Sequence, residues 1–109
     1  MEFAKVASTS EVPAGKMKMV KVGENEVLIA NVGGKYYAIG NRCTHAGGSL
    51  SEGSLEGNVV TCPKHGSKFD VTSGQAVQGP KIAFFKLKTK DEQVFEIKVE
   101  GTDILVRSV

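Results

Sequence analysis

The chain has 109 residues, enough for one domain around a single hydrophobic core and too few for a catalytic domain with an accessory one. Lysine and arginine total 14 and aspartate and glutamate total 12, so the net charge is only +2. That balance lacks the basic excess of a typical nucleic-acid-binding protein. We therefore expect a single domain, spanning residues 1–109, with no nucleic-acid partner.

The N-terminal segment MEFAKVASTSEVPAGK contains an early acidic residue, Glu2, and no apolar run like that of a signal peptide. No stretch elsewhere approaches the roughly 18 consecutive apolar residues of a membrane-spanning helix. We expect a soluble, cytoplasmic protein without membrane association. In that compartment, two cysteines more often serve metal or redox chemistry than a structural disulfide.

Residues 17–40, MKMVKVGENEVLIANVGGKYYAIG, predict a meander of three antiparallel strands. The three runs are rich in β-branched and aromatic residues, and glycine-containing turns at residues 23–25 and 33–34 separate them. No window of helical length carries an apolar stripe, so we expect little helix.

Residues 83–109 predict three further strands. Apolar and polar residues alternate over residues 95–99, and turn-forming residues at 90–92 and 101–103 mark the strand ends. The two strand-rich ends and the 13 glycines together indicate an all-β fold, an antiparallel sandwich or a partly open barrel.

The middle segment, residues 41–80, holds both cysteines and both histidines of the chain. Their spacing is C-x-H-x16-C-x2-H, so a histidine closely follows each cysteine and the two halves are chemically equivalent. If the cysteines share one metal ion and the histidines share another, two neighbouring ions with inorganic bridges use all four side chains. That arrangement is a binuclear iron–sulfur centre, and its candidate ligands are Cys43, His45, Cys62 and His65.

Three other interpretations of the four residues remain open. A Cys43–Cys62 disulfide would leave both histidines unexplained. A zinc site is chemically reasonable because zinc accepts both ligand types, but zinc fingers pair cysteine with cysteine and histidine with histidine along the sequence. A chance cluster of core residues fits poorly with the polar, glycine-rich surroundings.

The pattern resembles the Rieske 2Fe–2S motif, in which two histidines replace two cysteines on one iron. CTHAGGSL resembles the first cluster loop of that family and CPKHGSKFDVTSGQAVQGP the second, and the hairpin-rich flanks resemble its base. The resemblance implies one Rieske-type cluster. In this arrangement Cys43 and Cys62 would bind the inner iron, and His45 and His65 the outer iron near the surface.

The resemblance also implies two parts within the domain, a base of residues 1–40 and 81–109 and a small two-loop cluster-binding subdomain of residues 41–80. Respiratory and photosynthetic relatives brace the two loops with an additional disulfide. The corresponding positions here are Gly48 and Lys64, which cannot form one.

Further residues are assigned to the site by their place beside the ligands or by the resemblance. Gly47 and Gly66 allow backbone N–H groups to approach bridging sulfides. Pro80 matches a proline-containing loop that covers the cluster. Ser67 matches a serine that hydrogen-bonds to sulfur, whereas Phe69 stands where high-potential members have tyrosine. The missing hydroxyl predicts a potential in the lower half of the roughly −150 to +300 mV range of the class.

The function that the resemblance implies is one-electron transfer by a soluble, oxygenase-associated ferredoxin. Both histidines are used as ligands and none remains for a separate catalytic iron, so we expect an electron carrier rather than an enzyme. The expected partners are a flavin-dependent reductase and a terminal oxygenase, and the expected state is a monomer. The alternatives are a non-catalytic small subunit like that of some nitrite reductases and a zinc-stabilised interaction domain.

Overall fold

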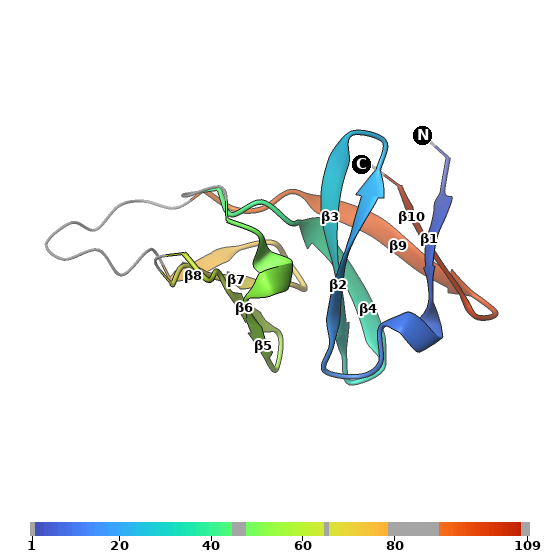
Figure 1. Cartoon of the computed structure of the whole chain (residues 1–109), viewed down its shortest axis with the longest axis horizontal. Coiled ribbons are helices and arrows are strands. Elements are labelled where there is room, and N and C mark those ends of the chain that lie inside the picture. The colour runs from blue at the N-terminus through green and yellow to red at the C-terminus, as the bar shows by residue number, and fades with distance from the viewer. Residues whose placement is uncertain (1, 45–47, 65, 79–89, 108–109) are drawn as a thin grey trace, which may run out of the picture.

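The computed structural model describes residues 2–44, 48–64, 66–78 and 90–107. Figure 1 shows two antiparallel sheets, a larger one that contains both ends of the chain and a smaller one built from the middle segment. In the described part of the chain the helical elements are two short 3-10 turns, η1 (Thr9–Glu11) and η2 (Leu50–Glu52). The all-β fold predicted from the sequence is therefore confirmed.

The larger sheet has six strands in the order β1-β10-β9-β4-β3-β2. Its two edge strands, β1 and β2, contact each other, so the sheet curls into an almost closed barrel. Closure of this kind covers sheet edges that would otherwise offer free backbone groups for aggregation. The strands are β1 (Ala4–Ser8), β2 (Met17–Val22), β3 (Asn25–Val32), β4 (Lys35–Gly40), β9 (Val94–Glu100) and β10 (Asp103–Arg107).

Two-residue turns connect the strands of the predicted meander. β2 pairs with β3 and β3 with β4 so that residues 23–24 and 33–34 close the two hairpins. Gly23 and Gly33 have φ angles of 63° and 61°, in the left-handed region that glycine adopts without a steric penalty. The glycines thus fix the register of β2, β3 and β4, as the sequence predicted.

The C-terminal part of the chain agrees with the sequence prediction at one hairpin and differs from it in two respects. β9 and β10 form the expected hairpin, with a turn at Gly101, but the third expected strand, within residues 83–89, lies outside the described residues. The prediction of a turn at residues 90–92 is wrong, because the backbone groups there form hydrogen bonds to distant loops and not to one another. The sequence did not predict β1. This strand pairs with β10, which lies at the other end of the sequence.

Strand β3 is buried on both faces and separates two hydrophobic cores. Val27 and Ile29 point into the barrel, whereas Leu28 and Ala30 point toward the small sheet. The first core, here called the base core, consists of Ala7, Val12, Val20, Val22, Val27, Ile29, Ala38, Phe95, Ile104 and Val106. The second, here called the shared core, consists of Leu28, Ala30, Ile39, Cys43, Leu50, Val60, Cys62, Phe69 and Val71.

The smaller sheet has four three-residue strands in the order β5-β6-β7-β8. They are β5 (Ser54–Glu56), β6 (Val59–Thr61), β7 (Lys68–Asp70) and β8 (Ala76–Gln78). Strands this short bury little surface by themselves, and three of the nine residues of the shared core belong to β3 and β4 of the larger sheet. The smaller sheet is therefore packed onto the barrel through the outer face of β3 and β4 (Figure 1).

The division of the domain at residues 41 and 80 stays a prediction, since residues 79–89 lie outside the described part of the chain. Among the described residues there is no helix with the length and apolar character needed to cross a membrane.

The hairpin of β5 and β6 supplies a test of this packing. A Cβ added at Gly53 would overlap the carbonyl oxygen of Thr61, a backbone atom that cannot move without opening the hairpin. At Gly57, in the turn of the same hairpin, a Cβ meets no atom within 4 Å and is opposed only by a φ of +59°. We expect Gly53→Ala to lower the free energy of unfolding by about 3 kcal/mol and Gly57→Ala by about 1 kcal/mol.

Urea unfolding followed by circular dichroism measures both variants. Equal losses in the two variants would contradict the close approach at Gly53.

Candidate metal centre

Two cysteines from separate loops lie side by side in the shared core. Cys43 follows β4 and Cys62 follows β6, and their exposed fractions are 2% and 1%. Both are free thiols. The thiols are close enough to influence each other's ionisation, and Phe69 packs in the same core. Two adjacent, reduced thiols sheltered from water form a ready pair of soft ligands for one metal ion.

The two cysteine loops are closed in the same way. The backbone N–H of Cys43 donates to the carbonyl of Gly48, and the backbone N–H of Cys62 donates to the carbonyl of Ser67, both at 2.7 Å. Each bond spans five residues and begins at the cysteine. The chemical equivalence that the sequence predicted for the two halves is therefore matched by equivalent backbone closure.

The surroundings of Cys62 hold its thiol in the protonated form. The pKa of Cys62 is raised to about 11, mainly by burial and also by the neighbouring Cys43, while a hydrogen bond from the backbone N–H of Lys64 opposes the shift. Because thiolate is the form that binds a metal, metal binding must release this proton. The Lys64 N–H is already directed at the sulfur that would carry the negative charge.

Glycines give the two loops room to approach each other. A Cβ at Gly48 would lie 3.0 Å from Cys62 Sγ and 3.3 Å from Lys64 Cγ. Gly48 and Lys64, the positions expected from the sequence to correspond to the additional disulfide of some relatives, are thus neighbours in space. Gly66 has a φ of 74°, which a residue with a side chain rarely adopts.

Ser67 carries an orphaned hydroxyl. The residue is completely buried, and its Oγ is the one buried side-chain polar atom in the described part of the chain without a hydrogen-bond partner. An isolated buried hydroxyl costs free energy unless a partner arrives. A cluster sulfide held by Cys43 and Cys62 is a suitable acceptor, so the residues present fit an iron–sulfur group.

Four of the predicted site residues lie outside the described part of the chain: His45, Gly47, His65 and Pro80. The described structure therefore brings together Cys43, Cys62, Gly66 and Ser67 in two adjacent loops. The role of each residue as a ligand or as a neighbour of the cluster stays a prediction.

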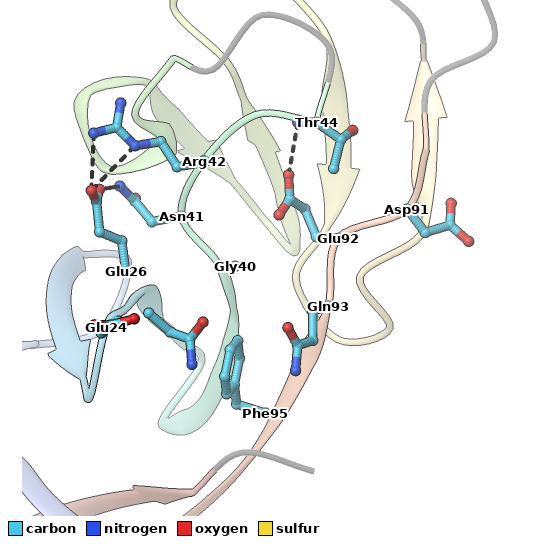
Figure 2. A pocket seen from close by; sticks show the side chains of 11 residues that line it. Glu24, Glu26, Gly40, Asn41, Arg42, Thr44, Asp91, Glu92, Gln93 and Phe95 are labelled. Carbon is cyan, nitrogen blue, oxygen red and sulfur yellow. Dashed lines mark hydrogen bonds and ion pairs between the residues drawn. The ribbon is translucent and has the colours of Figure 1, made fainter.

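A polar network that sequence reasoning missed supports the start of the first loop. Asn41, completely buried, donates through Nδ2 to Ser49 Oγ at 2.8 Å and accepts at Oδ1 from the backbone N–H of Ser51 at 2.9 Å. Arg42 forms an ion pair with Glu26 at 2.9 Å, and Figure 2 shows both residues at the rim of a cavity of about 450 Å³. These contacts fix the chain immediately before Cys43.

Glu92 is a second residue that sequence reasoning missed. Only 7% of it is exposed, and its Oε2 accepts a hydrogen bond of 3.1 Å from the backbone N–H of Thr44, directly after Cys43 (Figure 2). Burial raises the pKa of this carboxyl to about 7, although the Thr44 N–H favours the ionised form. No sequence signal distinguishes Glu92 from an exposed turn residue, because the residues that it contacts are distant in the sequence.

The paired buried thiols, the two equivalently closed loops and the orphaned hydroxyl, on a small sheet beside a β-barrel, are the features of a protein that holds an iron–sulfur cluster. Comparison with known families agrees: residues 2–90 match the Rieske 2Fe–2S domain. The chain belongs to this family, and the predicted cofactor, one Rieske-type 2Fe–2S cluster, is confirmed.

The chain is also similar over nearly its whole length to several characterised proteins. It is 39% identical to the ferredoxin component of biphenyl 2,3-dioxygenase from Rhodococcus jostii (strain RHA1), over 97% of this chain and 92% of that protein. It superposes with a TM-score of 0.86 and 26% identity on the ferredoxin of carbazole 1,9a-dioxygenase from Nocardioides aromaticivorans IC177, with complete coverage of both chains. A complex of reduced oxygenase and oxidized ferredoxin in carbazole 1,9a-dioxygenase matches at a TM-score of 0.83 and 34% identity, over 95% of this chain and 91% of that one.

The orphaned hydroxyl of Ser67 can be tested by removing it. Hydrogen bonds to cluster sulfurs stabilise the more negative reduced state, so we expect Ser67→Ala to lower the midpoint potential. Phe69→Tyr, which adds a hydroxyl in the same core, is expected to raise the potential. Voltammetry at pH 7 measures both variants. An unchanged potential in Ser67→Ala would remove Ser67 from the surroundings of the cluster.

The buried carboxyl of Glu92 predicts a pH dependence of stability. Its pKa rises from 4.5 to about 7 on folding, so the folded chain keeps a proton that the unfolded chain has lost between these values. The stabilisation is complete below pH 4.5, falls as pH rises through 7 and levels off above it, with a total on the order of 3 kcal/mol.

Thermal unfolding between pH 5 and 8 measures this effect, with Glu92→Gln as the variant that cannot titrate and Asp91→Asn as the control. We expect the curve of Glu92→Gln to be flatter than that of wild type. Parallel curves would show that Glu92 does not titrate in this range.

Proposed function

We propose that this chain is the electron-carrying ferredoxin of an oxygenase system that acts on aromatic rings. The single observation that carries the proposal is the full-length similarity to ferredoxin components of biphenyl, naphthalene and carbazole dioxygenases, in a chain that keeps the buried thiol pair. The cluster, when bound, takes up and releases one electron. Donation to a terminal oxygenase is supported by the solved oxygenase–ferredoxin complex of a relative.

The finer points of the proposal concern ligands and partners. Cys43 and Cys62 bind one iron and His45 and His65 the other, with Gly47, Gly66, Ser67 and Pro80 around them. A flavin-dependent reductase supplies the electrons. The protein works as a cytoplasmic monomer, carries out no chemistry on a substrate itself and does not associate with a membrane.

The described residues contribute to electron transfer by fixing the site rather than by moving. Two separate loops, each closed by its own backbone hydrogen bond, hold the thiols in an apolar core. Burial excludes water from the sulfur atoms, and the fixed geometry limits the rearrangement that accompanies a change of charge. These properties suit a carrier that must accept and pass on an electron without a change of ligands.

The ligand set is tested by composition and by exchange of one ligand. We expect iron and acid-labile sulfide each near two per chain, the stoichiometry of the binuclear centre. His65→Cys should retain part of the cluster and lower the potential, because a thiolate adds negative charge. One iron without sulfide, or a colourless protein with bound zinc, would end the proposal. An unchanged potential in His65→Cys with an intact cluster would remove His65 from the ligands.

The partner assignment requires a separate measurement. Protein reduced with dithionite and freed of excess reductant is mixed with the oxygenase component of a biphenyl dioxygenase, and its visible spectrum is followed by stopped flow. We expect reoxidation that is faster than with oxygen alone. Cys43→Ser, which is expected to lose the cluster, is the control. No acceleration with biphenyl, naphthalene or carbazole oxygenase components would overturn the assignment.

A further inference from the structure

The segment of residues 90–93, here called the strap, connects the first cysteine loop to the rest of the protein. Thr44 makes two hydrogen bonds to it: its hydroxyl donates to the carbonyl of Lys90 at 2.6 Å and its backbone N–H donates to Glu92 Oε2 at 3.1 Å. The backbone N–H of Glu92 donates in turn to the carbonyl of Gly74 at 2.7 Å. The strap thus joins the loop after Cys43 to the loop between β7 and β8.

Two more hydrogen bonds fix the position of the strap itself. Asp91 Oδ1 accepts from the backbone N–H of Ala76 at 2.8 Å, in β8. The backbone N–H of Gly40, at the end of β4, donates to the carbonyl of Gln93 at 2.8 Å. A segment without regular secondary structure is therefore held to both sheets, and a side chain on it has a defined place.

Two glycines leave room for Glu92, one beside its carboxyl and one beside its backbone. A Cβ at Gly40 would lie 2.6 Å from Glu92 Oε1, and a Cβ at Gly74 would lie 2.5 Å from the backbone oxygen of Glu92. A larger residue at Gly40 would therefore displace the carboxyl, and one at Gly74 would displace the strap. Burial of a carboxyl costs free energy. Packing alone would therefore not favour a glutamate that is buried against two glycines.

The other acidic residues around the cavity are placed differently. Glu24 and Asp91 are exposed, and Glu26 pairs with Arg42. Glu92 is therefore the one buried acidic residue among the described residues that line the cavity, and its charge is the least screened by water. Figure 2 shows its carboxyl directed at Thr44.

From this geometry we propose that Glu92 is a positioning residue for the iron–sulfur site, in which its buried carboxylate holds the main chain between Cys43 and His45 and lowers the potential of the cluster. The proposal rests on the ligand assignment given above. Thr44 is the residue between the two expected ligands of the first loop, so an anchor on its N–H limits how both ligands can move. A negative charge beside that loop opposes the addition of an electron to the cluster, because the reduced cluster is the more negative state.

Three variants of the holoprotein test the proposal. Glu92→Gln keeps the shape and an oxygen acceptor but removes the charge, and Glu92→Ala removes both. Asp91→Asn is the matched control, since it neutralises the adjacent carboxyl, which bonds to Ala76 instead of the first loop. The measurements are the midpoint potential at pH 9, where the carboxyl with a pKa of about 7 is ionised, the EPR g values of the reduced protein and the rate of iron release to a chelator.

We expect Glu92→Gln to keep the wild-type g values and to shift the midpoint to a more positive value than Asp91→Asn does. Glu92→Ala should have altered g values or release iron faster than wild type. Glu92→Gln should lie closer to wild type in both properties. If Glu92→Ala does not fold, the pair Glu92→Gln and Asp91→Asn decides. An intact cluster with the same midpoint in these two variants overturns the proposal while leaving the ligand assignment standing. A wild-type protein without the cluster overturns both.

Discussion

The site depends on the burial of two thiols, from different loops, against each other in an apolar core. Apolar surroundings disfavour the thiolate of Cys62, as its raised pKa shows, so this thiol stays protonated until a positive ion compensates the charge. The same burial opposes exchange with water once a metal is bound. The backbone bonds that close each loop, from Cys43 to Gly48 and from Cys62 to Ser67, keep the sulfurs in place in either condition.

Support for this thiol pair comes from two strands of the larger sheet. Leu28 and Ile39 form part of the wall of the shared core, while their neighbours Ile29 and Ala38 fill the barrel on the other side. β3 and β4 therefore stabilise both cores at once. On the opposite side, the strap ties the first cysteine loop to β4 and β8 through short hydrogen bonds. The first cysteine loop is thus held by two sets of contacts, and β4 takes part in both.

The sequence predicted the features that depend on residue type and local spacing. Cysteine and histidine are scarce and chemically distinctive, and Gly23 and Gly33 occupy turns that require their conformation. It missed β1, whose only strong reason to be a strand is pairing with β10, about 100 residues away. It also placed Glu92 in a turn, since nothing in the sequence indicates that Gly40 lies against its carboxyl or that Gly74 lies against its backbone oxygen. Both errors arise from tertiary contacts that override local preference.

The shared core has a consequence for protein engineering. A designer who moved only the segment from Asn41 to Gln78 onto another scaffold would leave Leu28, Ala30 and Ile39 behind, and the thiols would lose one wall of their enclosure. The graft would expose the sulfurs to solvent and to oxidants, even with every ligand present. A transferable module must therefore include the outer face of β3 and β4, or a recipient barrel that offers the same three apolar side chains.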